Sequence, residues 1–405
     1  MELLGVVGVL AFIIALLASV MIHEAGHYFT AKRYGMKVTE FFLGFGARIW
    51  STRRGETEFG IKAIPAGGYC KIVGMTPHEE IAEEDKDRTF LGGTIRERLI
   101  VLGAGSFLHF VLGFILIFTL FVGVGINQAL NRVDEVVPCI VTTNEGECLP
   151  NSAKSPALVA GIQEGDEIVA IRKPDEQSIT VDMKWEDVLE VIRSSPNEAV
   201  IVTVVRESER FEVALTLGSR TVAGETRGVI GIISSYGIVR LGPIEGAIES
   251  ARFVGDVVKG SATALVRLPV MIPDLINQTF GDEERDPEGL VGVVGVARTT
   301  GEISSSERLD FHGKVVFFLL IVAGLNIFVG IFNLLPILPL DGGHMAVAIV
   351  DGVRRANAKR KGRTAPPPVD VEKLTPITLI VVVLMISLTV LLLLADIINP
   401  VRLGL

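Results

Sequence analysis

Residues 1–30 carry the feature that most constrains this chain. An apolar run from Leu3 to Ile22 contains no charged residue and leads directly into His23, Glu24, Ala25, Gly26 and His27. The run is long enough to cross a bilayer as a helix. On a helix, positions four apart lie about 40° from eclipsing, so His23 and His27 share one face with Glu24 beside them. This is the HExxH pattern, in which two imidazoles bind one zinc ion.

Accidental spacing is the alternative explanation of this motif. The chain has only 6 His in 405 residues, which makes a chance HExxH rare. Two imidazoles and a carboxylate at the end of a membrane helix are also costly to desolvate unless they bind something. We therefore expect one Zn²⁺ per chain, with His23 and His27 as ligands and Glu24 as the catalytic group.

The composition predicts an integral membrane protein, because 49% of the residues are hydrophobic and the mean hydropathy is +0.49. Four spans are expected, within residues 1–30, 99–126, 315–343 and 377–396. The first lacks both a basic segment before it and a small-residue cleavage site after it. We therefore expect a retained helix and not a signal peptide.

Lys and Arg predict the orientation of these spans. The connection 28–98 carries 12 of them, and the basic loop 344–376 concentrates six between Arg354 and Arg363. Residues 127–312 hold 17 Lys and Arg against 30 Asp and Glu. We expect residues 28–98 and 344–376 in the cytoplasm, and residues 127–312 and both termini outside a cytoplasmic (inner) membrane. The basic clusters flank membrane ends, so we expect no nucleic-acid partner.

The cytoplasmic-side loop 31–98 is unusually apolar. Phe41 to Gly46 and Glu58 to Gly74 show strand patterns broken by Pro65, Gly67 and Gly68. A β-hairpin that dips into the membrane beside the metal explains this composition. A small sheet on the bilayer surface remains the alternative.

The pattern of residues 136–235 predicts a soluble, β-rich domain outside the membrane. Strands are expected at Glu167–Ile171, Ala199–Arg206 and Arg210–Leu217, with a helix at Trp185–Ser194 and a closing strand at Gly228–Ile233. This α+β pattern resembles a PDZ domain. The resemblance implies that a peptide ligand binds in the groove of the domain as an added strand at the sheet edge. A chance strand and turn pattern is the alternative.

The rest of the outer segment, residues 240–312, is expected to hold amphipathic helices on the outer membrane face and a linker over 280–306. Cys139 and Cys148 lie nine positions apart on the expected outer side, where disulfides persist, so we predict that they pair. Cys70, on the cytoplasmic side, is expected to be a reduced thiol.

The third membrane helix places Asn326 and Asn333 on one face and is followed by Leu340, Asp341 and Gly342. By topology, Asp341 lies on the same membrane side as His23. A zinc site with two His needs a third protein ligand, and Asp341 is the best-placed carboxylate. A helix cap is the alternative role for Asp341. In the second helix, His109 either lines the active-site cavity or hydrogen-bonds a neighbouring helix, and we favour the second.

These residues together resemble the site-2 protease family of intramembrane zinc metalloproteases, specifically the bacterial members that cleave anti-sigma factors. The resemblance rests on the HExxH motif, the Gly44 to Gly46 stretch, the Gly105 region, the PDZ-like domain and the segment from Asn333 to Gly342. The family usually has Gly, Pro and then Asn in the second helix. This chain keeps the glycine, Gly105, but has Ser106 and His109 where the family has Pro and Asn.

The resemblance implies hydrolysis of a peptide bond in the transmembrane segment of single-span proteins such as anti-sigma factors, after a first extracytoplasmic cut. The substrate helix must unwind, and the expected contacts to its extended form are Asn333, Asn326, Gly67 and Gly68. Two rival readings are a membrane-anchored PDZ adaptor with an inactive metal site, and an ion transporter. The favoured fold is a polytopic α-helical membrane protein with a membrane-associated β-hairpin and an extracytoplasmic PDZ-like domain, in contact with the lipid bilayer.

Overall fold

The computed structural model describes residues 3–75, 79–140, 148, 152–177, 182–222, 224–281, 283–286, 289–364 and 366–401. The chain divides into two compact units. Unit 1 comprises Met1–Val124 and Leu241–Leu405, and unit 2 comprises Gly125–Arg240.

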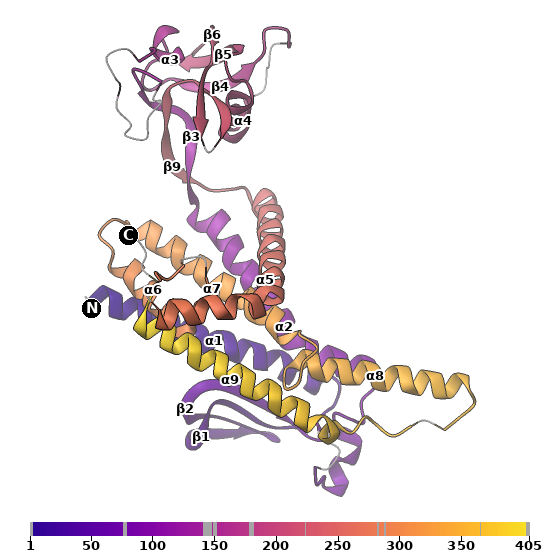
Figure 1. Cartoon of the computed structure of the whole chain (residues 1–405). Helices are drawn as coiled ribbons and strands as arrows, with labels where there is room; N and C mark the ends of the chain where they lie inside the picture. Colours follow the sequence, from indigo (N-terminus) through magenta and orange to yellow (C-terminus); the bar gives the residue numbers. More distant parts are fainter. Residues whose placement is uncertain are drawn as a thin grey trace. The chain divides into compact units, whose positions relative to one another are not determined.

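Four long apolar helices form the framework of unit 1 (Figure 1). They are α1 (Leu3–Arg33), α2 (Ile95–Phe118, continued by the π-helical turn η2 at Thr119–Val124), α7 (Phe311–Asn333) and α9 (Thr375–Ile398). Each contains an 18-residue window with a mean hydropathy of at least 2.6, as expected for a helix that faces lipid as well as protein. Helices long and apolar enough to cross a membrane lie in all four places where spans were predicted, which is consistent with a polytopic membrane protein.

Glycine allows α1, α2 and α7 to approach closely. A Cβ atom built on Gly26 of α1 would lie 2.7 Å from the backbone of Ala104 in α2. One built on Gly113 of α2 would lie 2.7 Å from Ile327 in α7. Small residues at such contacts are typical of membrane helix packing.

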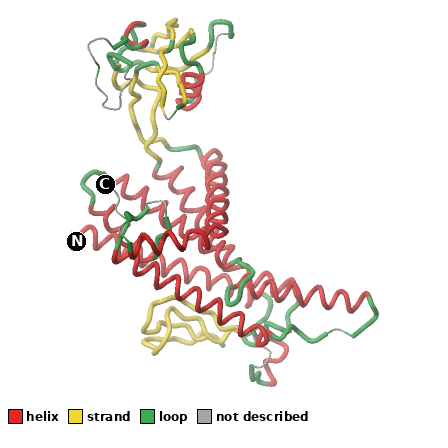
Figure 2. The backbone as a smooth tube through the Cα atoms, viewed as in Figure 1, coloured by secondary structure: helices red, strands yellow, loops and turns green. Residues whose placement is uncertain are grey.

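The predicted hairpin region forms a two-stranded sheet of β1 (Val38–Arg54) and β2 (Thr57–Ile72) beside the helices (Figure 2). Each strand bends and pairs with the other twice. Phe42 of β1 therefore lies opposite Tyr69 and also opposite Gly60 of β2. Gly68 of β2 packs against α1, where its Cβ position would lie 3.0 Å from Met21 Sδ. A short 3₁₀ helix, η1 (Glu83–Arg88), follows.

The region predicted to hold amphipathic helices is helical, as one continuous helix, α5 (Pro243–Phe280). Three other predictions for unit 1 were wrong. The expected linker contains α6 (Val293–Ser305), which packs closely on α1 where Gly8 meets Ser304. Most of the basic loop is α8 (Asp341–Arg360), followed by η3 (Val371–Leu374). The third span also ends at Asn333, so Asp341 begins α8 and does not lie on α7.

Unit 2 is built on a five-stranded antiparallel sheet in the order β6-β5-β4-β3-β9. Its strands are β3 (Ile126–Val136), β4 (Glu167–Arg172), β5 (Ala199–Arg206), β6 (Glu209–Thr216) and β9 (Ile232–Val239). The helices are α3 (Pro156–Val159) and α4 (Trp185–Ser194), and β7 (Gly218–Val222) with β8 (Glu225–Val229) forms a separate hairpin. Apolar residues of β4, β5 and α4 form the buried core.

The predicted limits of this domain, 136–235, were too narrow. β3 pairs with β9 from Ile126↔Val239 to Val136↔Ile232, so the residues before and after the predicted range belong to the sheet. The expected closing strand was also misplaced, because residues 230 and 231 separate β8 from β9.

The predicted disulfide is present. Cys139 and Cys148 are bonded, with their Cα atoms 5.9 Å apart, and Cys70 is a free cysteine.

Replacing both Cys139 and Cys148 by Ser is expected to destabilise unit 2 by about 2–3 kcal/mol in the chain-entropy model, because the closed loop is short. Hydrogen exchange of the β4 and β5 amides in the intact protein measures this loss. Cys70→Ser, which removes the free thiol of the same chain, serves as the control and should leave these amides unchanged. Equal protection in all three proteins contradicts a stabilising role for the disulfide.

Candidate metal centre

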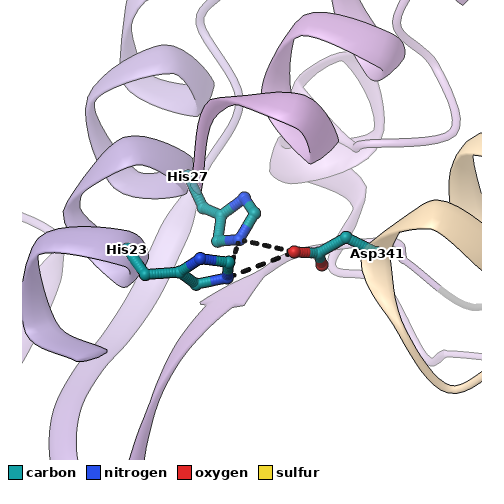
Figure 3. Close-up of side chains that lie close together, drawn as sticks. All are labelled: His23, His27 and Asp341. Atoms are coloured by element: carbon teal, nitrogen blue, oxygen red, sulfur yellow. Dashed lines mark hydrogen bonds and ion pairs between the residues drawn. The ribbon is translucent and has the colours of Figure 1, made fainter. Parts of the chain in front are cut away.

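Three predicted ligands from two distant parts of the chain meet in unit 1 (Figure 3). His23 and His27 project from the last third of α1, and Asp341 is the first residue of α8. Asp341 Oδ2 lies 3.1 Å from His23 Nε2 and 3.3 Å from His27 Nε2, and the two Nε2 atoms are 3.1 Å apart. Both histidines are buried, with 7% of their surface exposed.

These spacings fit a tetrahedral zinc site. With ligands about 2.0–2.1 Å from the ion, neighbouring ligand atoms are about 3.3–3.4 Å apart. The three measured separations fall within a few tenths of an ångström of this value. Two imidazoles and one carboxylate are also a donor set that catalytic zinc sites use, with one position left for water.

Hydrogen bonding fixes the orientation of His27. Its Nδ1 lies 2.8 Å from the backbone oxygen of Val101 on α2, which only accepts hydrogen bonds. Nδ1 therefore carries the proton, and Nε2 presents its lone pair toward Asp341. Ligand histidines in metal sites are commonly oriented in this way.

The helix-cap alternative for Asp341 does not hold. Leu340 occupies the N-cap position of α8, and no side-chain cap bond is present there. The Asp341 carboxylate instead faces the two imidazoles.

Three glycines make room for the ligands. A Cβ atom on Gly105 of α2 would lie 2.5 Å from His23 Cε1, so the ring of His23 lies directly on that glycine. Cβ atoms on Gly342 and Gly343 would lie 2.3 Å and 2.5 Å from the backbone of Leu334 and Leu338. The turn between α7 and α8 therefore folds tightly against the start of α8 and sets the position of Asp341.

A buried ion pair holds α8 against α2 farther along. Arg98 Nη1 lies 3.2 Å from Asp351 Oδ2, and both residues are 2% exposed. The other carboxylate oxygen of Asp351 accepts a hydrogen bond of 2.7 Å from the amide of Val369. No local sequence pattern predicts this pair, because its partners are 253 positions apart.

Glu24 stands half-buried beside the histidines, within hydrogen-bonding reach of the Cys70 amide on β2. Burial, with the adjacent Glu24, raises the pKa of the Cys70 thiol to about 12. Cys70 is therefore a neutral thiol at physiological pH.

The residues predicted to contact substrate differ in how deeply they are buried. Asn326 is 1% exposed, and its side chain is bonded to His109, Ser19 and the Val322 carbonyl, so the substrate contact expected for it finds no free group. His109 makes the predicted bond to a neighbouring helix, and its ring centroid also lies 5.0 Å from that of His23. Asn333, at the end of α7, and Gly67 and Gly68, on β2, are half-buried.

Comparison with known proteins gives a consistent family relationship. The model of Peptidase family M50 matches residues 11–367. The chain is 34% identical to zinc metalloprotease Rip1 of Mycobacterium tuberculosis (strain ATCC 25618 / H37Rv), over 98% of this chain and 99% of that protein. It is 25% identical to zinc metalloprotease RasP of Geobacillus kaustophilus, over 85% and 90% of the two chains. A putative zinc metalloprotease of Nostoc sp. is 27% identical, over 85% and 86%.

Gly105→Ala is expected to lower metal affinity roughly tenfold or more, because overpacking against His23 costs about 1–3 kcal/mol. Competition with a chelator measures the affinity. Gly103→Ala, two residues away on α2, is the matched control, since its Cβ position lies 3.7 Å from Met345 in ordinary contact. If both alanine variants bind metal like the wild type, the position of the His23 ring for metal binding does not depend on Gly105.

Proposed function

Because this chain belongs to Peptidase family M50 and is a zinc metalloprotease, we propose that it hydrolyses peptide bonds within or near the transmembrane segment of single-span membrane proteins. The convergence of His23, His27 and Asp341 at one end of an apolar helix is the observation that carries this proposal. A metal site at that place serves substrates that approach through the membrane.

In this proposal His23, His27 and Asp341 hold the zinc, through the two Nε2 atoms and a carboxylate oxygen. When bound, the ion polarises the scissile carbonyl and acidifies the attacking water. Val101 keeps His27 in the required tautomer through its backbone oxygen. The turn before α8 keeps Asp341 within reach of both rings.

Glu24 is the proposed general base and acid. It follows His23 directly, so its carboxylate lies next to the metal ligands without being one of them. It takes a proton from the attacking water and then delivers it to the leaving amine. The backbone amide of Cys70 donates a hydrogen bond to the Glu24 carboxylate and helps to fix its position.

The edge of β2 is the proposed binding place for an unwound substrate. A helix hides its carbonyls in internal hydrogen bonds, so the scissile segment must become extended before attack. The stretch Gly67–Cys70 runs past α1 close to Met21 and Glu24, and an extended peptide can add to such an edge as a further strand. Asn333 remains a candidate for a second contact.

The substrate class and setting follow from the family resemblance and from charge. Anti-sigma factors trimmed first by an extracytoplasmic protease are the proposed substrates. The distribution of Lys and Arg favours a multi-pass protein of the cytoplasmic membrane with the metal site near the cytoplasmic side. Unit 2 and both termini then lie outside.

Unit 2 is proposed to be a PDZ-like domain. A hollow of about 260 Å³ lies between α4 and the segment Gly228–Ile232, lined in part by Trp185 and Leu189. A peptide end fits such a groove. We propose, however, that unit 2 acts mainly by size, excluding substrates whose outer domains have not been removed.

Glu24→Gln is expected to lower peptide cleavage by about 10²-fold or more and to leave zinc bound, because it removes the proton carrier and keeps the ligands. His23→Ala and Asp341→Asn should lose both zinc and activity. Zinc content and cleavage of a membrane peptide are measured on the same preparations. Substantial activity in Glu24→Gln contradicts the role proposed for this residue.

Replacing unit 2 by a short flexible linker is expected to permit cleavage of untrimmed substrate. Ile126 and Val239 are paired neighbours, so a short linker bridges the two ends of the unit. Leu189→Arg, which changes only the groove, should alter cleavage little. If the shortened protein holds zinc and cleaves trimmed substrate but still rejects untrimmed substrate, size exclusion by unit 2 is wrong.

A further inference from the structure

Three buried polar side chains connect α1, α2 and α7 inside the apolar helix bundle. Ser19, His109 and Asn326 are 4%, 2% and 1% exposed. Asn326 Nδ2 lies 3.1 Å from Ser19 Oγ, and Asn326 Oδ1 lies 2.8 Å from His109 Nδ1. Polar groups at membrane depth are costly and usually serve a function. The roles proposed above for the metal ligands and Glu24 leave this connection unexplained.

The bonds of Asn326 determine where His109 carries its proton. Asn326 Nδ2 lies 2.7 Å from the carbonyl oxygen of Val322, which only accepts hydrogen bonds. The amide nitrogen must therefore face Val322 and Ser19, and the amide oxygen must face His109. That oxygen also only accepts, so His109 Nδ1 is protonated. In neutral His109, the lone pair is then on Nε2.

His23 presents the complementary group. Its Nε2 faces Asp341, so when it binds a metal through Nε2 its Nδ1 carries the proton. His23 Nδ1 is buried and has no hydrogen-bond partner among the residues that the structure describes. His27 differs, because its Nδ1 donates to Val101. The Nδ1 of His27 thus has an acceptor, whereas the Nδ1 of His23 has none among the described residues.

The two rings lie close together. The rings of His23 and His109 have centroids 5.0 Å apart, with planes inclined by 39°. Gly105, under the ring of His23, and His109 are one turn apart on α2. This separation suits a direct hydrogen bond after a small ring rotation, or a single bridging water.

We propose that His109 Nε2 accepts the hydrogen bond of His23 Nδ1–H and thereby positions this ligand for the metal. The proposal rests on the proposed ligand role of His23. His109 is a positioning residue, and Asn326 holds it in the required tautomer from α7. The metal site is then tied to the packing of all three helices. Loss of an acceptor of this kind typically lowers metal affinity about 10- to 100-fold.

The test compares three variants of the full-length protein by chelator competition for zinc. His109→Phe retains a ring but offers no acceptor, and we expect its zinc affinity to fall about 10- to 100-fold. His109→Gln offers one acceptor and one donor on a side chain of similar reach, and should restore most of the affinity. Ser106→Ala is the matched control: Ser106 is fully buried on the same helix, and its hydroxyl has no partner among the described residues. It should bind zinc like the wild type.

A spectroscopic readout separates positioning from a loss of folding. In the cobalt-loaded protein, the ligand-field bands should shift in His109→Phe and return toward the wild-type positions in His109→Gln. Nitrogen NMR of the wild type with labelled histidine should show His109 protonated at Nδ1, assigned as the signal that His109→Gln removes. The protonation site is read in the wild type, and the variant serves only to assign the signal.

Wild-type affinity in His109→Phe, or a proton on Nε2 of His109, overturns the proposal. These outcomes are distinct from failure of the proposed function. If the wild type itself holds no zinc, or holds it after removal of His23, the ligand assignment is wrong and the role of His109 falls with it.

Discussion

The meeting of His23, His27 and Asp341 is the constraint on which the rest of the membrane unit depends. An unprotonated Nε2 of His27 and a carboxylate oxygen point to the same place as Nε2 of His23, with separations of 3.1–3.3 Å. In apolar surroundings such a convergence of electron-rich atoms is unfavourable unless a cation joins them. One divalent ion satisfies all three atoms at once.

Much of the neighbouring structure can be understood as support for this convergence. α1 supplies two ligands on one face, but α2 must approach so closely that only glycine is tolerated at position 105. α8 must begin where it does, and a tight turn at one end and the Arg98–Asp351 pair farther along hold it there. β2 lies beside the same end of α1, next to Glu24. Glu24 and two ligands therefore come from α1, the third ligand from the start of α8, and the proposed substrate edge from β2.

The ligands were predictable because each left a local signal. His23 and His27 are four apart on a helix, and Asp341 follows a span whose orientation places it on the same membrane side. The membrane helices were predictable from their length and apolar composition. α8 was missed because the basic residues after Arg354 were explained by topology alone, and α6 because its Gly and Ser content is typical of a linker.

Other features depend on tertiary contacts that no local pattern encodes. Asn326 and Asn333 share a helix face, which suggested a shared role, yet Asn326 is bonded on all sides within the bundle. The Arg98–Asp351 pair joins residues 253 positions apart. The first and last strands of unit 2 were missed because each is recognisable only once it pairs with the other.

X-ray absorption at the zinc edge of the purified, full-length protein tests the central claim most directly. We predict one zinc per chain, surrounded only by nitrogen and oxygen at about 2.0–2.2 Å, with the scattering pattern of two imidazoles. A sulfur neighbour at about 2.3 Å would place Cys70 among the ligands, and a spectrum without imidazole would remove His23 and His27. Either result contradicts the metal centre described for this protein.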